Sequence, residues 1–194
     1  MVGGVVMGRR DNSKLTKWGI IGGAIAGAAA MITIIPALKK RAMRPTTILK
    51  KDHRMVSGLM MTLQMTPRIN GMVRRRLFDQ IRHSLMVHTQ AEEEILYPAM
   101  RHLMLMNGQS KVDESYREHQ RIKDLLNDLT AMDPTSDAFD TKLMDLKNII
   151  QHHVEEEEEE MFPLLMQRMS ADEQEVLGRR IHDRKMDLRV RTAA

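Results

Sequence analysis

The feature that most limits the fold is an internal repeat of histidine and glutamate. Residues 88–98 read HTQAEEEILYP and residues 153–163 read HVEEEEEEMFP. Each stretch has a histidine, a glutamate four residues later, two further glutamates, an apolar–aromatic pair and a proline ten residues after the histidine. In this register His88 matches His153 and Glu92 matches Glu157. The chain therefore contains two copies of one structural unit.

The repeat also extends to a histidine upstream of each stretch. His53 precedes His88 by 35 residues, and His119 precedes His153 by 34. Each half of the domain is thus predicted to be a helix hairpin with one histidine on its first helix and His-x-x-x-Glu on its second. Because residues four apart share a helix face, two facing hairpins bring four histidines and two glutamates to the axis of a bundle.

Apolar residues at helical spacing predict five helices, at residues 48–64, 72–104, 112–132, 137–169 and 170–188. Thr46 or Thr47 is the expected N-cap of the first helix, and Ser170 with Glu173 forms a capping box for the last. No segment has the pattern of a strand. We expect an all-α fold, an up-down-up-down four-helix bundle over residues 48–169. An extra C-terminal helix and tail (170–194) and an N-terminal membrane helix would accompany it.

The N-terminal region differs from the rest of the chain. After a basic segment, residues 1–17, residues 18–38 read WGIIGGAIAGAAAMITIIPAL without a charge, and a linker follows at 39–47. A helix of 21 residues rises roughly 31 Å, about the thickness of a bilayer core. This predicts a single-pass membrane anchor, and the lysines and arginine at 39–41 favour a cytoplasmic main domain. The spacing of Gly19, Gly23 and Gly27 suits a homodimer or a larger membrane complex.

A cleaved signal peptide is the alternative for the same region. Arg9 and Arg10 precede the apolar run, and Ala28 to Ala30 offer a small-residue cleavage site. Cleavage would make the main domain secreted or periplasmic. The uncharged run continues well past these alanines, which favours the anchor.

Charge and composition exclude several classes of function. The net charge is +4, but residues 1–44 carry a balance of +7 and the remaining 150 residues a balance of −3. A nucleic-acid binder would carry its basic excess on the folded domain, so no nucleic-acid partner is expected. The absence of cysteine excludes disulfides, thiolate metal sites and iron–sulfur clusters. The 19 methionines are expected to fill irregular helical cores.

The repeated residues suit a metal site with nitrogen and oxygen ligands. Imidazole with carboxylate binds iron, manganese or zinc, and two glutamates able to bridge cations favour a dinuclear centre. Six protein ligands leave positions for a bridging oxo or hydroxo group and for a small ligand such as O2. Within the glutamate run Glu157 shares the face of His153, and Glu158 is the main alternative ligand. The other histidines lie outside the repeat and are not assigned as ligands: His83, His102, His152 and His182.

These residues resemble the hemerythrin-like family, also called the HHE cation-binding domain. The resemblance covers about residues 45–170 and is carried by His53, HTQAE at 88–92, His119 and HVEEE at 153–157. It implies a four-helix bundle that holds two non-haem iron ions, with Glu92 and Glu157 as bridging carboxylates. The implied ligands are His53, His88, Glu92, His119, His153 and Glu157. A ferritin-like site would require Glu-x-x-His, which occurs nowhere in this chain.

One position departs from the oxygen-carrying members of that family. They have a further histidine four residues after the third-helix histidine, where this chain has Lys123; their acid five residues after the fourth-helix histidine corresponds to Glu158. The departure argues against simple reversible O2 carriage. Tyr116, about one turn before His119, is a candidate to complete or tune the site.

The leading functional hypothesis is a membrane-anchored di-iron protein that binds or reacts with O2 or a related small oxidant. Sensing, delivery and detoxification all fit this description. The alternative is an accessory subunit of a membrane complex that uses the bundle as an interaction module. Iron storage or ferroxidase activity is a third hypothesis.

Overall fold

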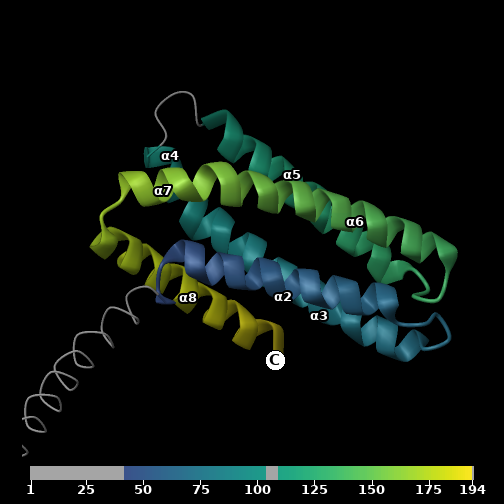
Figure 1. The fold of residues 1–194 in the computed structure, drawn as a ribbon. Helices are drawn as coiled ribbons and strands as arrows, with labels where there is room; N and C mark the ends of the chain where they lie inside the picture. Colours follow the sequence, from purple (N-terminus) through teal and green to yellow (C-terminus); the bar gives the residue numbers. More distant parts are fainter. Residues whose placement is uncertain (1–41, 104–108, 194) are drawn as a thin grey trace, which may run out of the picture. The chain divides into compact units, whose positions relative to one another are not determined.

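A computed structural model describes residues 42–103 and 109–193, and every regular element within these ranges is a helix. The first two rods of the bundle are α2 (Pro45–Met65) and the stack of α3 (Gly71–Ala91), η1 (Glu92–Leu96) and α4 (Tyr97–Leu103). The other two are α5 (Gln109–Ala131) and the stack of α6 (Asp137–Glu156), η2 (Glu157–Met161) and α7 (Phe162–Arg168). The last helix is α8 (Ala171–Ala193). Figure 1 shows α2 paired with α3 and α5 with α6, so the predicted four-helix bundle with an extra helix is confirmed.

Local capping signals set several of the helix starts. The Ser136 hydroxyl accepts a hydrogen bond from the backbone N–H of Phe139 at 3.1 Å and caps α6. The predicted capping box is confirmed, because the Glu173 carboxylate accepts from the Ser170 N–H at 2.8 Å. The predicted threonine N-cap of the first helix is wrong. That helix begins at Pro45, since proline suits the first helical turn, where its missing N–H leaves no bond unmade.

The two longest predicted helices are interrupted at matching places. Both η1 and η2 are five-residue π-helical turns, and each begins at the repeated glutamate, Glu92 or Glu157. The N–H of Tyr97 reaches back five residues to the carbonyl of Glu92, and Phe162 does the same to Glu157. The proline that follows each turn has no N–H for an α-helical bond. The repeated proline therefore favours the wider turn at both places.

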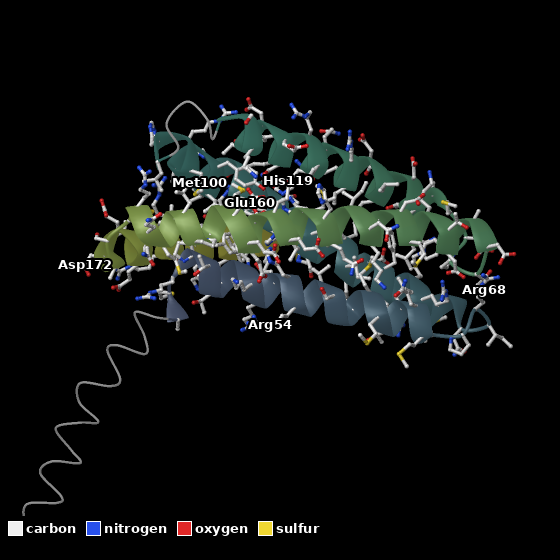
Figure 2. All side chains as sticks on the ribbon, turned by 45° about the horizontal axis from the view of Figure 1, so that its top comes forward. Arg54, Arg68, Met100, His119, Glu160 and Asp172 are labelled. Carbon is white, nitrogen blue, oxygen red and sulfur yellow. The ribbon has the colours of Figure 1, made fainter. Side chains whose placement is uncertain are left out.

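The core consists of two apolar clusters with a polar layer between them. One cluster fills the end of the bundle near the 66–70 and 132–136 turns, with Phe78 and Phe139 at its centre. The other surrounds Leu96, Tyr97 and Phe162 and includes residues of α8. Charged groups cover the outer faces of the helices (Figure 2). The expectation about methionine is only partly met: Met60, Met100 and Met161 are buried, whereas Met55, Met61, Met65, Met72, Met86, Met144, Met166 and Met186 are exposed.

Helix α8 packs on the first hairpin, along α2 and α3 (Figure 1). A Cβ atom at Gly178 would lie 1.6 Å from the backbone oxygen of Met43, so only glycine permits this approach. Ile181 and Leu188 are buried on the same helix. Lys185 follows Gly178 by two helical turns, so it lies on the same face of α8. Its side chain is buried.

The expected membrane segment cannot be compared with the structure. Residues 18–38, with Gly19, Gly23 and Gly27, lie outside the described residues, as does most of the linker. Among the helices that are described, none has the length and apolar character needed to cross a bilayer.

Candidate metal centre

The six residues selected by the repeat lie together in the polar layer. Each of the four rods contributes, and no member of the set is more than 5% exposed. Figure 2 marks the position of His119 on α5. The set comprises His53 on α2, His88 on α3, Glu92 on η1, His119 on α5, His153 on α6 and Glu157 on η2.

The six side chains form two groups that share a carboxylate. One group contains His53, His88, Glu92 and Glu157; the other contains Glu92, His119 and His153; within each, the potential ligand atoms lie within 4.8 Å of one another. Oε2 of Glu92 lies 3.1 Å from Nε2 of His88 and 3.4 Å from Nε2 of His119. Glu157 also reaches both groups, because its Oε2 lies 3.4 Å from His53 Nε2 and its Oε1 lies 3.8 Å from His153 Nε2. The arrangement could hold two adjacent cations, with Glu92 and Glu157 lying between the two groups of histidines.

Each of the four imidazole rings contacts a further carboxylate through its Nδ1 atom. The Nδ1 atoms contact Glu158 (from His53, 2.8 Å), Asp52 (from His88, 3.3 Å), Glu93 (from His119, 3.0 Å) and Glu118 (from His153, 2.9 Å). A carboxylate at Nδ1 selects the tautomer that leaves Nε2 free for a metal. All four Nε2 atoms therefore face the centre of the bundle.

These orienting carboxylates follow the same internal repeat. Asp52 and Glu118 directly precede His53 and His119, and Glu93 and Glu158 directly follow the two repeated glutamates. Sequence reasoning missed three of them, although their adjacent, repeated positions were a usable signal. Glu158 had been considered as an alternative ligand. The structure instead places it 28% exposed on Nδ1 of His53, while Glu157 is fully buried in the cluster.

Several buried atoms of the site make no hydrogen bond. They are both carboxylate oxygens of Glu92, Oε2 of Glu157 and Nε2 of His53. An unsatisfied buried carboxylate is costly, so such groups are normally paired or bound to a cation. The donor set contains nitrogen and oxygen alone, which suits iron, manganese or zinc. The residues present therefore fit a pair of divalent or trivalent metal ions.

The protonation of the site without metal is consistent with this fit. Burial lowers the pKa of His88 to about 4, so its imidazole is neutral at pH 7 and able to donate an electron pair. Burial and the charge of Glu157 raise the pKa of Glu92 well above its usual range. Burial opposes ionisation of Glu157 too, but His153 and His53 outweigh it and lower its pKa to about 2. Added cations would let both carboxylates ionise.

The two halves differ at the aromatic residue of the repeat. The Tyr97 hydroxyl lies 3.0 Å from Nε2 of His119 and donates to Oε1 of Glu157 at 3.1 Å. Its counterpart Phe162 stacks on the His53 ring at a centroid distance of 6.0 Å. Tyr116, the tyrosine proposed from sequence, donates instead to the backbone oxygen of Glu93, outside the group of six residues. Tyr97 is therefore the tyrosine at the centre.

A small cavity borders the histidines on the side of the first apolar cluster. About 10 Å³ of it is open to the centre of a water-sized sphere, which is at the lower limit for holding one water molecule. Its apolar lining includes Val56, Leu85, Ile122 and Ile150, and its polar lining includes His53, His88 and His153. The site therefore adjoins a small space with apolar side chains on one side.

Comparison with known proteins finds relatives of low sequence identity. A cyanobacterial protein from Nostoc sp., named DNA nickase, is 28% identical over 160 residues, which are 81% of this chain and 44% of that protein. A hemerythrin-like protein of Schizosaccharomyces pombe is 28% identical over 44% of this chain and 42% of its own length. The chain thus spans less than half the length of both relatives.

A solved structure and a family model complete the comparison. A crystal structure of a hemerythrin HHE cation-binding domain-containing protein from Mycobacterium kansasii superposes with a TM-score of 0.65. At 24% identity it covers 75% of this chain and 87% of its own, and it shows the shared fold. The family described as the hemerythrin HHE cation-binding domain matches residues 44–165. The chain therefore belongs to the hemerythrin HHE family of metal-binding domains.

Proposed function

We propose that this domain holds two iron ions between its hairpins and that the centre binds or reacts with O2 or a related small oxidant. The observation that carries the proposal is the group of buried carboxylate and imidazole atoms without hydrogen bonds at the meeting point of both histidine groups. When bound, an iron pair supplies open coordination positions and one-electron chemistry toward such ligands. Manganese or zinc would fit the same donors.

The protein's own contribution is to fix the ligands and exclude water. The four carboxylates at the Nδ1 atoms hold the rings in place before any ion arrives. Burial keeps His88 and His119 neutral, which removes competition from protons at these two rings. The Tyr97 hydroxyl is the one phenolic donor among the described residues at the centre, and it is placed to donate a hydrogen bond there.

The shape of the surroundings supports a small, weakly polar ligand. Val56 and Ile150 line the buried cavity and also the base of a groove between α2 and α6, of which about 210 Å³ is open to the centre of a water-sized sphere. These two side chains separate the groove from the histidines. We propose that O2 or a similar molecule enters past them, and that Ile150→Phe slows its entry without changing the metal content.

The direct test is metal analysis with optical spectroscopy of the purified protein. After anaerobic reconstitution with Fe²⁺ we expect about two iron ions per chain and a change of the visible spectrum on adding O2. No bound iron, or spectra that O2 leaves unchanged, would contradict the proposal. Glu155→Gln is the matched control, because Glu155 is exposed and outside the cluster.

The name of the Nostoc relative suggests DNA chemistry, but we do not extend it to this chain. This chain spans 44% of that protein, and its own notable feature is a buried group of histidine and glutamate side chains. Incubation of the iron-loaded protein with supercoiled plasmid would reveal nicking. Plasmid relaxation that Glu157→Gln abolishes would favour DNA as a substrate.

Membrane attachment through residues 18–38 is also part of the proposal. Its support is the 21-residue uncharged stretch followed by Lys39, Lys40 and Arg41. Retention in the membrane fraction after an alkaline wash, and an N-terminus at Met1, would separate an anchor from a cleaved signal. If loss of metal leaves membrane assembly and phenotype intact, the alternative of an accessory subunit is favoured over oxidant chemistry.

A further inference from the structure

The four orienting carboxylates are not equally neutralised by basic side chains. Lys50 lies 2.9 Å from Glu158, and Lys123 lies 2.7 and 2.8 Å from the two oxygens of Glu93. Lys185 of α8 donates to Asp52. Across residues 42–103 and 109–193, Glu118 is the one of the four that pairs with no lysine or arginine. Its contacts are with two histidines: His153 at Oε2, and His152 at 3.5 Å from Oε1.

The internal repeat shows what stands in place of the missing lysine. Glu118 corresponds to Asp52, so the surroundings of the two carboxylates can be compared directly. Beside Asp52 the first hairpin has the buried apolar residues Val87 and Ala91. Helix α8 packs on this hairpin, and its Lys185 donates to Asp52. The counterparts of Val87 and Ala91 on the second hairpin are His152 and Glu156. The ammonium group of Lys185 lies beside the carboxylate of the first hairpin. In the second hairpin the corresponding place has the imidazole of His152 and the carboxylate of Glu156.

The geometry points to a cation at that place. We propose that Glu118, His152 and Glu156 form a third metal site, at the surface, for a divalent cation of the Zn²⁺, Mn²⁺ or Fe²⁺ class. Their potential ligand atoms lie within 4.8 Å of one another, with His152 Nε2 at 3.5 Å from Glu118 and 3.8 Å from Glu156. Ligand atoms about 2.1 Å from one ion lie roughly 3.4 Å apart in a tetrahedral site, so small side-chain movements suffice.

The burial of the three groups suits an ion that keeps part of its water. The Glu118 side chain is 6% exposed, so its second oxygen has little access to solvent and gains from a cation. The His152 side chain is 62% exposed and Glu156 25%, which leaves space for water ligands. Because Oε2 of Glu118 holds His153, a cation at Oε1 would share one carboxylate with the support of the central site.

The test counts bound ions in the whole protein by native mass spectrometry during titration with Zn²⁺. We expect two tightly held ions and a weaker third, and His152→Ala or Glu156→Gln should weaken the third at least about tenfold while keeping the tight pair. Glu155→Gln, next to the site but outside it, should bind as the wild type does. His152 and Glu155 have exposed side chains and Glu156 is 25% exposed, so little change in thermal unfolding is expected.

Three outcomes would overturn this inference. The wild type shows no third ion; the third ion persists in the His152→Ala, Glu156→Gln double variant; or Glu155→Gln loses it equally, which indicates adventitious surface binding. The inference does not depend on which metal the centre holds. A centre without iron but with a third Zn²⁺ sensitive to His152 would contradict the proposed function and leave this site standing.

Discussion

The two hairpins of this bundle have the same ligand chemistry but different surroundings. Each supplies one histidine, a His-x-x-x-Glu pair, a π-helical turn and two orienting carboxylates. They differ in what lies just outside: Tyr97 against Phe162, and the buried Lys185 against the exposed His152. The comparison indicates that the two halves share the same candidate ligands and differ in the residues just outside them.

The largest effect is expected at the two glutamates that lie close to histidines of both hairpins. Glu92→Gln and Glu157→Gln each replace a bridging carboxylate by a neutral amide, and we expect either change to reduce the metal content to less than half of the wild-type value. Glu155→Gln should change it little, since that side chain is exposed. Metal analysis after reconstitution checks this. Retention of both ions in Glu157→Gln would exclude its proposed role, and binding lost only in Glu158→Gln would reassign the ligand.

The next effect concerns the buried ion pair of the first hairpin. Asp52→Asn leaves Lys185 buried without its partner and weakens the support of His88, so we expect about 3 kcal/mol of lost stability and a 10–100-fold loss of metal affinity. Glu118→Gln in the second hairpin should lose a similar affinity but less stability, because its neighbour His152 is exposed. Urea unfolding of the metal-free proteins measures the difference.

Lys185→Met is the control for that comparison. It removes the buried ammonium of α8 and keeps Asp52, so it separates the loss of the ion pair from the loss of the orienting carboxylate. Equal destabilisation by Asp52→Asn and Glu118→Gln would show that α8 does not distinguish the two halves.

How much of the fold and of the site could be predicted from the sequence depends on how far apart the interacting residues lie along the chain. The helices and the six central residues follow from local periodicity and from a repeat, both of which are visible along the chain. Their role as ligands stays a prediction that metal analysis must test. The sequence prediction continues both helices through the π-helical turns because the apolar pattern is unbroken there, and Pro98 and Pro163 are the local signals of the interruption. Lys185 could not be foreseen, because it depends on how α8 packs, through Gly178, against the start of α2.

The choice of tyrosine shows the same limit within one helix turn. The sequence favours Tyr116 because it lies close to His119, yet its hydroxyl donates to the backbone oxygen of Glu93. Tyr97 belongs to the repeat and turns inward because the π-helical turn brings residues five apart, Glu92 and Tyr97, to the same side. Membership in the repeat therefore identifies the tyrosine at the centre better than closeness to His119 along an ideal α-helix does.

The protonation of the two matched histidines should differ in the metal-free protein. Burial lowers the pKa of His88 to about 4. Burial acts on His153 in the same direction, but the charge of Glu157 and the hydrogen bond that His153 donates to the Glu118 carboxylate outweigh it and raise its pKa. We therefore expect the His88 ring to titrate well below the His153 ring when followed by NMR. Coincident titration of the two rings would remove this distinction between the halves.

The same shift predicts how stability changes with pH when metal is absent. Between pH 6.5 and 4 the unfolded chain binds a proton at His88 that the folded protein takes up only near pH 4. The contribution of His88 to the free energy of unfolding therefore falls as the pH drops through this window, by up to about 3 kcal/mol. His88→Gln should show a shallower decline in the same unfolding series, and an unchanged slope would contradict the assignment.

The smallest effect is expected from exchanging the aromatic residues of the repeat. Tyr97→Phe removes one buried hydroxyl and its bond to Glu157, so stability should change by about 1 kcal/mol and metal content should stay the same. The optical spectrum of the loaded protein should shift, because the hydroxyl lies 3.0 Å from a histidine nitrogen that faces the metal position. Phe162→Tyr adds a hydroxyl in the other half, beside His53. If the two halves are distinguished by this hydroxyl, the double exchange should reproduce a wild-type-like spectrum only in part, because α8 and Lys185 still mark the first hairpin.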